Sequence, residues 1–198
     1  MPKIYGLTGS IGMGKSAVAA MIARLGVPLF DADAQVHRLQ GPGGKALAAI
    51  EARFPGTTGP AGLDRARLAA IVLAHPHERK ALEAIIHPMV REARHDFLRR
   101  YASRPLVVFD IPLLFETHGH RELDGVIVVT APAWKQRKRV LARPGMTEEK
   151  FRRIRALQMP DAVKRRRADH VIETGATFDR TRAQVRALIA CLLRKAGG

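Results

Sequence analysis

The chain has 198 residues, a length typical of a single folding unit with room for a sheet covered by helices. Hydrophobic residues make up 46% and charged residues 26%, a globular composition that excludes a disordered or membrane-embedded chain. The formal net charge of +16 favours polyanionic partners, either nucleic acids or polyphosphate substrates. Because the basic residues are spread along the sequence, we interpret most of them as solvated helix faces around a cleft, and we expect no nucleic-acid partner.

The N-terminal residues lead directly into an apolar segment, and no apolar run approaches about 18 residues. We therefore expect no signal peptide, no membrane partner and a cytoplasmic site of action. The one cysteine, Cys191, excludes an intramolecular disulfide and a thiolate metal cluster, and we interpret it as a packing residue.

The stretch from Gly9 to Ser16 has the pattern G-x-x-x-x-G-K-S and follows the apolar run 4–7, which predicts a strand. Glycines let successive backbone N–H groups close round phosphates, Lys15 reaches the β/γ oxygens, and the Ser16 hydroxyl can ligate Mg²⁺. A plain glycine turn is the alternative, but the flanking context favours a bound nucleoside triphosphate. The residues expected to contact it are Gly12, Met13, Gly14, Lys15, Ser16 and Ala17.

Five short segments, rich in Val and Ile or bounded by turn residues, are expected to be strands: 3–8, 27–31, 105–110, 125–130 and 169–173. Helical patterns separate most of them, and the apolar runs are nearly continuous rather than alternating. This arrangement predicts an α/β fold of the P-loop NTPase type, with a parallel five-stranded sheet and helices on both faces.

Two excursions interrupt the expected core. Between the second and third strands there is no strand signal, and helices are expected at 46–54, 68–74, 78–87 and 89–101, with a turn-rich break at 55–60 and further boundaries at Pro76 and Pro88. A basic helix beginning at Trp134 meets Pro144-Gly145, and a new helix starts at Thr147, which together predict a lid. A terminal helix over 178–194 is expected to pack on the sheet. We therefore expect one domain over 1–198, with a core (1–39, 102–133 and 168–198), a helical insertion (40–101) and a lid (134–167).

Ligands of such sheets bind beyond the carboxyl ends of the strands, where this chain carries acids. Asp31 and Asp33 follow the second strand, and one of them is expected to accept the proton of an attacking hydroxyl or to hold Mg²⁺ through water. A helix N-cap explains only one of the pair, and we favour Asp33 for catalysis. Asp110 ends the third strand, the position of a Walker-B acid. The apolar run 112–116 is either a substrate wall or core, and the pattern favours core.

Basic residues of the predicted lid can stabilise the charge that develops during phosphoryl transfer. Arg139 and Arg143 are four residues apart, so we expect them to share one helix face and one of them to reach the transferred phosphate. His87, before Pro88, either contacts substrate or makes a structural hydrogen bond, and spacing alone favours the structural role.

Taken together, several motifs resemble the dephospho-CoA kinase family in order and spacing, from residue 4 to about residue 175. They are the loop 6–16, Asp31-Ala32-Asp33 with His37, His87-Pro88, Pro112-Leu113-Leu114-Phe115-Glu116, Gln136 with Arg139 and Arg143, Gln158, and Ala168-Asp169-His170-Val171-Ile172. The resemblance implies ATP-dependent phosphorylation of the ribose 3′-hydroxyl of dephospho-coenzyme A, the last step of coenzyme A synthesis.

By the same resemblance, Asp33 is the base or hydroxyl-orienting acid, Lys15 and Ser16 serve the phosphates and Mg²⁺, and Arg139 and Arg143 are lid arginines. Asp33 or Asp110 would assist the metal through water. Thr8 and His87 line the substrate side, and the insertion takes the acceptor. The sequence departs from the family pattern at Ser10, Met13, Ala17 and Pro144.

Other classes remain as alternatives. Another small-molecule or nucleotide kinase would share the P-loop. A nucleic-acid-binding ATPase would use the positive charge, but aromatic residues are only 5% of the chain, which leaves little for base stacking. A GTP switch is disfavoured because no Asn-Lys-x-Asp sequence is present.

Overall fold

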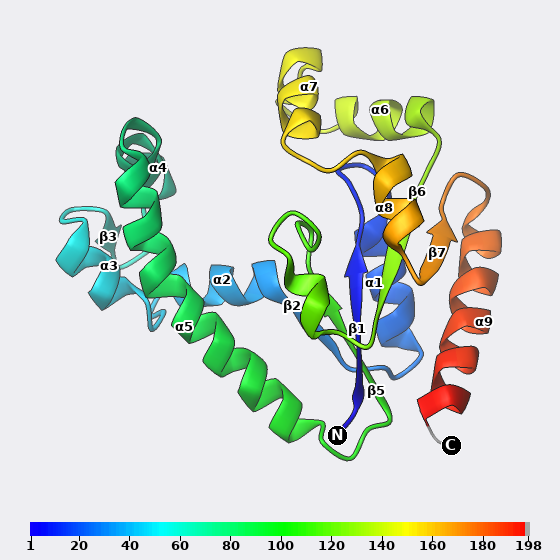
Figure 1. Cartoon of the computed structure of the whole chain (residues 1–198). Helices are drawn as coiled ribbons and strands as arrows, with labels where there is room; N and C mark the ends of the chain where they lie inside the picture. The colour runs from blue at the N-terminus through cyan, green and yellow to red at the C-terminus, as the bar shows by residue number, and fades with distance from the viewer. Residues whose placement is uncertain (197–198) are drawn as a thin grey trace. The chain divides into compact units, whose positions relative to one another are not determined.

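The computed structural model describes residues 1–196 of the chain (Figure 1). It divides into two compact units: Met1–Phe30 together with the chain from Tyr101 onward, and Asp31–Arg100. The second unit begins at Asp31, earlier than residue 40, where we expected the insertion to start. Each unit is described by itself.

The first unit is built on a five-stranded parallel sheet. The strands are β1 (Lys3–Thr8), β2 (Leu29–Asp31), β5 (Leu106–Asp110), β6 (Gly125–Thr130) and β7 (His170–Glu173), in the order β2-β5-β1-β6-β7. The central strand β1 pairs in parallel with β5 and β6, and β6 pairs in parallel with β7. The predicted α/β fold is confirmed, with β2, β5 and β7 shorter than their predicted segments.

Both faces of the sheet are covered, as the continuous apolar runs predicted. Every residue of β5 and β6 is buried. Ile127 and Val129 of β6 belong to a core with α1 (Lys15–Arg24) and α9 (Phe178–Ala196). Val126 and Val128, which alternate with them along the strand, pack in a second core with Leu114 and Phe115. Since successive strand residues point to opposite faces, these are two separate cores on either side of β6. The predicted packing of the terminal helix on the sheet is confirmed.

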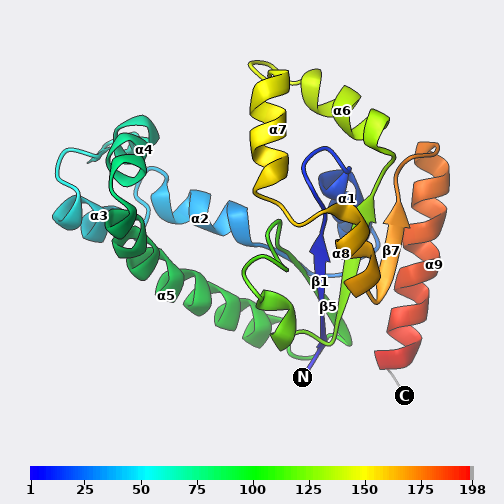
Figure 2. The ribbon, with the colours of Figure 1, turned by 45° about the horizontal axis from the view of Figure 1, so that its top comes forward.

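The rest of the first unit is helical. It contains a 3₁₀ turn, η1 (Gly119–Glu122), and the helices α6 (Ala133–Leu141), α7 (Glu148–Ala156) and α8 (Asp161–Arg167). Figure 2 shows α6 and α7 beyond the carboxyl end of β6, and α8 beside the sheet, where it contacts β6. No helix of residues 1–196 combines the length and the hydropathy needed to cross a membrane.

One prediction about this region was wrong. The helix expected to carry Arg139 and Arg143 ends at Leu141, because the chain turns at Pro144-Gly145, so the two arginines do not share a helix face. Most basic residues of α8 are exposed, but Lys164 is fully buried and is not part of a solvated face.

The second unit is helical with one small hairpin. Its elements are α2 (Ala32–Gln40), α3 (Leu47–Arg53), β3 (Thr58–Gly59), β4 (Gly62–Leu63), α4 (Arg65–Ala74) and α5 (Pro76–Arg100). Leu39, Ile50, Phe54, Leu68 and Ile86 form its core.

Here too the structure corrects the sequence-based expectations. The segments 78–87 and 89–101 form one helix, α5, which continues through Pro88. Ile85, Ile86 and Met89 on both sides of the proline pack into the same core, and this burial outweighs the lost backbone hydrogen bond. The predicted break at 55–60 holds part of an antiparallel hairpin, β3 with β4, whose two-residue strands are too short to give a periodic signal.

Candidate active site

The glycine-rich loop between β1 and α1 adopts a conformation that requires its glycines. Gly12 and Gly14 have φ values of 76° and 89°, in the left-handed region that residues with a Cβ rarely adopt. A Cβ on Gly12 would lie 2.4 Å from Val140 Cγ2, and one on Gly14 would lie 3.0 Å from the Thr174 hydroxyl. Lys15 begins α1 directly after this loop, so the N-terminus of the helix, with its positive dipole end, adjoins it. This is the backbone geometry of an anion-binding loop.

Lys15 and Asp110 form an ion pair across the end of the sheet. The Lys15 ammonium donates a hydrogen bond to Oδ1 of Asp110, the last residue of β5. The two side chains are 17% and 5% exposed, so the pair is largely shielded from water. The register of β1 and β5 places Asp110 opposite Leu7, one residue before the end of β1. The acid predicted at the end of the third strand therefore meets the lysine of the loop.

The other loop residues predicted from sequence have different surroundings. Thr8 is fully buried, and its hydroxyl donates to the carbonyl of Pro112 at 2.9 Å. Ser16 is exposed in the first turn of α1. The N–H of Ala17 donates to the carbonyl of Gly14 at 3.1 Å, so its backbone closes the turn into the helix.

Polar side chains from three other segments bind backbone groups of the loop. Gln136 on α6 donates from Nε2 to the Ile11 carbonyl at 2.8 Å, and Oε1 of Gln158, after α7, accepts from the Ile11 N–H at 3.0 Å. The Thr174 hydroxyl, after β7, donates to the carbonyl of Met13 at 2.7 Å. The two glutamines had been singled out only by the resemblance, without a role, and no signal in the sequence marked Thr174.

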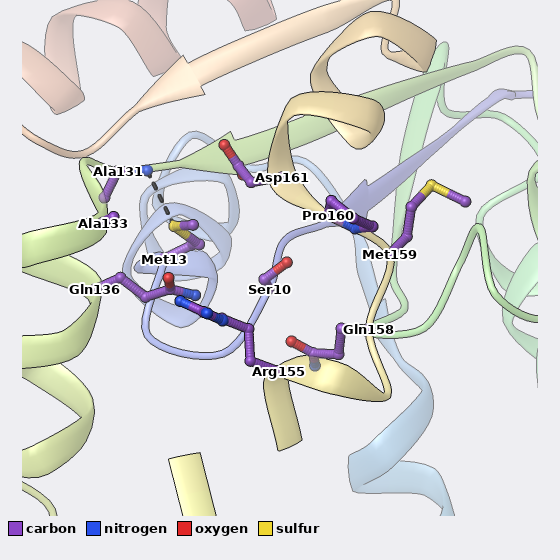
Figure 3. A pocket seen from close by; sticks show the side chains of 10 residues that line it. All are labelled: Ser10, Met13, Ala131, Ala133, Gln136, Arg155, Gln158, Met159, Pro160 and Asp161. Carbon is purple, nitrogen blue, oxygen red and sulfur yellow. Dashed lines mark hydrogen bonds between the residues drawn. The ribbon is translucent and has the colours of Figure 1, made fainter. Parts of the chain in front are cut away.

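A cavity of about 380 Å³ adjoins this network (Figure 3). Its wall includes the two glutamines and Met13, whose sulfur accepts from the Ala131 N–H at 3.1 Å. The remaining lining residues are Ser10, Ala131, Ala133, Arg155, Met159, Pro160 and Asp161. Figure 3 shows Ser10 of the loop near Gln136 from α6 and near Arg155 and Gln158 from the end of α7 and the chain after it.

The two lid arginines differ in environment. Arg139 is half-buried and donates to the Thr174 hydroxyl at 2.9 Å, to the Thr174 carbonyl at 2.7 Å and to the Gly12 carbonyl at 3.4 Å. Arg143 is exposed beyond the end of α6. Trp134, 64% exposed in the first turn of α6, has the Lys135 ammonium 5.7 Å from its ring centroid. Arg139 thus bridges the loop and the end of β7, whereas Arg143 faces solvent.

The acids after β2 have separate surroundings within the second unit. Asp31 is the N-cap of α2, and its Oδ1 accepts from the Ala34 N–H at 2.8 Å. Asp33 lies in the first turn of α2 and is exposed. His87 is an exposed residue within α5 rather than at a helix end. The N-cap role therefore belongs to Asp31, which leaves the Asp33 carboxylate as the acid open to solvent.

The run after β5 is core at its centre, as the pattern favoured. Leu114 and Phe115 are buried, while Leu113 is 42% exposed. Glu116 forms an ion pair at 2.9 Å with the fully buried ammonium of Lys164, and it accepts from the Met159 N–H at 2.7 Å. Burial alone would raise the pKa of Glu116, but Lys164 and the Met159 N–H outweigh it and hold the pKa below its usual value. This pair fixes the chain just after Gln158.

Comparisons with known proteins agree with this site. The dephospho-CoA kinase family model matches residues 3–179. A dephospho-CoA kinase of Novosphingobium aromaticivorans is 58% identical over 194 residues, covering 98% of this chain and 96% of its own length. One of Mesorhizobium japonicum is 54% identical over 188 residues, 94% of each chain.

Solved structures agree as well. A Thermus thermophilus protein superimposes with a TM-score of 0.84 at 37% identity, over 96% of this chain and 98% of its own. A dephospho-CoA kinase from Campylobacter jejuni has a TM-score of 0.68 at 22% identity, covering 96% and 97%, and shares the fold. These matches do not favour the alternative kinases or the nucleic-acid ATPase. The chain belongs to the dephospho-CoA kinase family, which catalyses the last step of coenzyme A biosynthesis.

Proposed function

We propose that this chain transfers the γ-phosphoryl group of ATP to the ribose 3′-hydroxyl of dephospho-coenzyme A through the residues described above. The observation that carries the proposal is the glycine-rich loop with Lys15 held at its helical end by Asp110. A loop of this geometry presents N–H donors and a lysine cation to a polyphosphate, the charge arrangement that phosphoryl transfer requires.

In this proposal Gly12, Met13, Gly14, Lys15, Ser16 and Ala17 hold the nucleotide. The ammonium of Lys15 exchanges its contact with Asp110 for the β/γ oxygens when the nucleotide binds. The N-terminus of α1 adds a favourable potential at the same place.

Asp33 is proposed to orient the 3′-hydroxyl of the acceptor and to take its proton. Asp31 is engaged as the N-cap of α2, whereas Asp33 is exposed and not needed for capping. A carboxylate that accepts the proton of an attacking alcohol is a recurring feature of kinases. Thr8 and His87 are proposed to line the substrate side.

Arg139 and Arg143 are proposed to stabilise the charge on the transferred phosphoryl group. Arg139 already contacts the Gly12 carbonyl, and Arg143 is exposed just before Pro144-Gly145. Two guanidinium groups can spread the charge of the equatorial oxygens and exclude water when the lid closes.

The donor set near the loop fits Mg²⁺ that arrives with the nucleotide. Mg²⁺ keeps several waters and takes one or two protein oxygens plus substrate phosphates. Ser16 supplies a hydroxyl in the first turn of α1, and Asp110 supplies a carboxylate at the end of β5. We propose Ser16 as its direct protein ligand, with Asp110 or Asp33 acting through water. Bound Mg²⁺ would neutralise part of the phosphate charge.

The cytoplasm is the compartment we propose for this activity. The support is compositional: a single cysteine, Cys191, leaves the fold independent of disulfides and so compatible with a reducing compartment. Fractionation of the source cells, with the protein detected by antibody, tests this assignment.

A competition assay tests the activity. Dephospho-coenzyme A, adenosine monophosphate and gluconate are offered together with Mg-ATP, and the phosphorylated products are separated. Phosphorylation of dephospho-coenzyme A alone supports the proposal. Turnover of either other acceptor in its place would contradict it, and ATP hydrolysis that rises many-fold with single-stranded DNA or RNA would favour the nucleic-acid ATPase.

A further inference from the structure

The backbone of Ile11 is held on both sides by amide side chains from the lid region. Gln158 accepts from its N–H at 3.0 Å, and Gln136 donates to its carbonyl at 2.8 Å. The orientation of each amide follows from its partner, because a backbone N–H only donates and a backbone carbonyl only accepts. Gln158 must therefore present its oxygen and Gln136 its nitrogen.

The hydrogen bond from Gln136 to the Ile11 carbonyl also fixes the direction of the Gly12 N–H. In a planar trans peptide, the C=O of one residue and the N–H of the next point in opposite directions. With the Ile11 carbonyl held by Gln136, the Gly12 N–H must point away from α6. The Thr174 hydroxyl on the Met13 carbonyl acts in the same way on the Gly14 N–H. These hydrogen bonds thus turn the N–H groups of Gly12 and Gly14 away from Gln136 and Thr174.

Both glutamines are themselves fixed. Gln136 is 4% exposed within α6, next to the core residue Val140. Gln158 is followed by Met159, whose N–H is bound by Glu116, and Glu116 is paired with the buried Lys164. Figure 3 shows the two amides approaching the loop from different segments, α6 and the chain after α7.

We infer that Gln136 and Gln158 are positioning residues that set the phosphate-binding conformation of the glycine-rich loop and connect it to both ends of the lid. Neither side chain needs to touch the nucleotide. Because Gln136 precedes Arg143 on the chain and Gln158 follows α7, a movement of the lid would reach the loop through these two hydrogen bonds. The inference rests on the proposed nucleotide site.

The test uses the opposite roles of the two side chains: position 158 must accept a hydrogen bond, and position 136 must donate one. Gln158→Glu keeps an oxygen acceptor for the Ile11 N–H, whereas Gln136→Glu places an acceptor against the Ile11 carbonyl. Both variants add the same negative charge beside the same residue, so each controls for the charge of the other. Gln136→Met and Gln158→Met remove the hydrogen bonds with little change of volume and no change of charge.

Dissociation constants for ADP and adenosine are measured by calorimetry, with melting temperature as the control for folding. We expect each Met variant to bind ADP about five- to tenfold more weakly, the range of one neutral hydrogen bond. Gln136→Glu should bind ADP at least about tenfold more weakly than Gln158→Glu. Adenosine lacks phosphates, so its affinity should change by less than about twofold in every variant, an effect that general unfolding would not produce.

The inference is overturned if the two Glu variants bind ADP equally, if adenosine binding falls as much as ADP binding, or if both Met variants bind ADP as the wild type does. Should Gln136→Glu unfold, Gln136→Met decides, and unfolding of that variant too would make Gln136 a core residue and refute the inference. Wild-type protein that fails to bind ADP would instead refute the proposed function, so the two failures are distinguishable.

Discussion

The ammonium of Lys15, at the start of α1, is hydrogen-bonded to the carboxylate of Asp110, at the end of β5. The pair joins the glycine-rich loop to the neighbouring strand of the sheet and keeps the lysine side chain ordered before any phosphate arrives. In the proposed nucleotide complex, phosphate oxygens would replace Asp110 as the partner of the Lys15 ammonium.

Lys15→Ala is expected to lower turnover roughly 100-fold or more, because it removes a cation that stabilises charge developing on the phosphates. The fold should stay intact, but the melting temperature should fall, since the Asp110 carboxylate, 5% exposed, loses the Lys15 ammonium. Steady-state phosphorylation and thermal unfolding measure the two effects. Lys195→Ala, an exposed residue of α9, is the matched control. Near-normal turnover of Lys15→Ala would contradict the phosphate assignment.

Substitutions of Asp31 and Asp33 should have different effects, on stability for Asp31 and on turnover for Asp33. Asp31→Ala removes the N-cap of α2 and should cost about 1 kcal/mol of stability, while Asp31→Asn, which can also cap, should cost little. Asp33→Asn should slow turnover with little change in ATP affinity and little change in stability. Urea unfolding and single-turnover kinetics provide the two readouts. A large loss of ATP affinity in Asp33→Asn would instead indicate a metal ligand.

Arg143→Ala is expected to lower turnover about 100-fold while leaving acceptor binding nearly unchanged, because the side chain is exposed and acts only when the lid closes. Arg139→Ala should also weaken nucleotide binding and lower the melting temperature, since Arg139 binds Thr174 and the Gly12 carbonyl. The comparison of kcat with KM for each substrate distinguishes the two. An unchanged rate in Arg143→Ala would leave Arg139 as the arginine that contacts the transferred phosphate.

Removing one partner of the buried Lys164–Glu116 ion pair should lower the free energy of unfolding. Lys164 is fully buried, so Lys164→Met leaves the Glu116 carboxylate without its cation and is expected to destabilise the protein by about 3 to 5 kcal/mol. The double variant Lys164→Met with Glu116→Gln carries no unpaired charge and should recover much of this loss. Urea unfolding of both variants and the wild type measures the coupling. Equal stabilities of the single and double variants would show that the loss does not come from the uncompensated Glu116 carboxylate.

The same pair predicts a dependence of stability on acid. The pKa of Glu116 is lower in the folded than in the unfolded protein, so its contribution is fully present above the ordinary carboxyl pKa of 4.5 and is lost as pH falls through the folded value. Glu116→Gln should therefore flatten the fall in stability below that pH. Urea unfolding at several pH values tests this, and parallel pH profiles for wild type and variant would refute it.

The sheet could be predicted from the sequence because strands buried on both faces consist of continuous apolar residues, as in Leu106-Val107-Val108-Phe109. The family assignment, made from the motifs, was confirmed by the comparisons. The roles of individual site residues, among them Asp33 and Arg143, remain predictions.

Other features could not be predicted from local sequence patterns, because they depend on contacts between residues distant in sequence. Pro88 predicts a helix end, yet packing on both sides carries α5 through it. From the sequence, Lys164 is expected to be a solvated cation like its neighbours. In the fold it is buried and paired with Glu116, which is distant in sequence. Gln136 and Gln158 are ordinary polar residues in sequence, and only the fold brings both to the backbone of Ile11.

Trp134 gives this protein an intrinsic optical label. It is the sole tryptophan of the sequence, so indole emission originates from one place, the exposed first turn of α6. Any rearrangement that changes the polarity around this ring, or moves the Lys135 ammonium from it, will alter the emission spectrum. Stopped-flow mixing with substrates can therefore time the motion of α6 in the unmodified chain, without dyes or engineered cysteines.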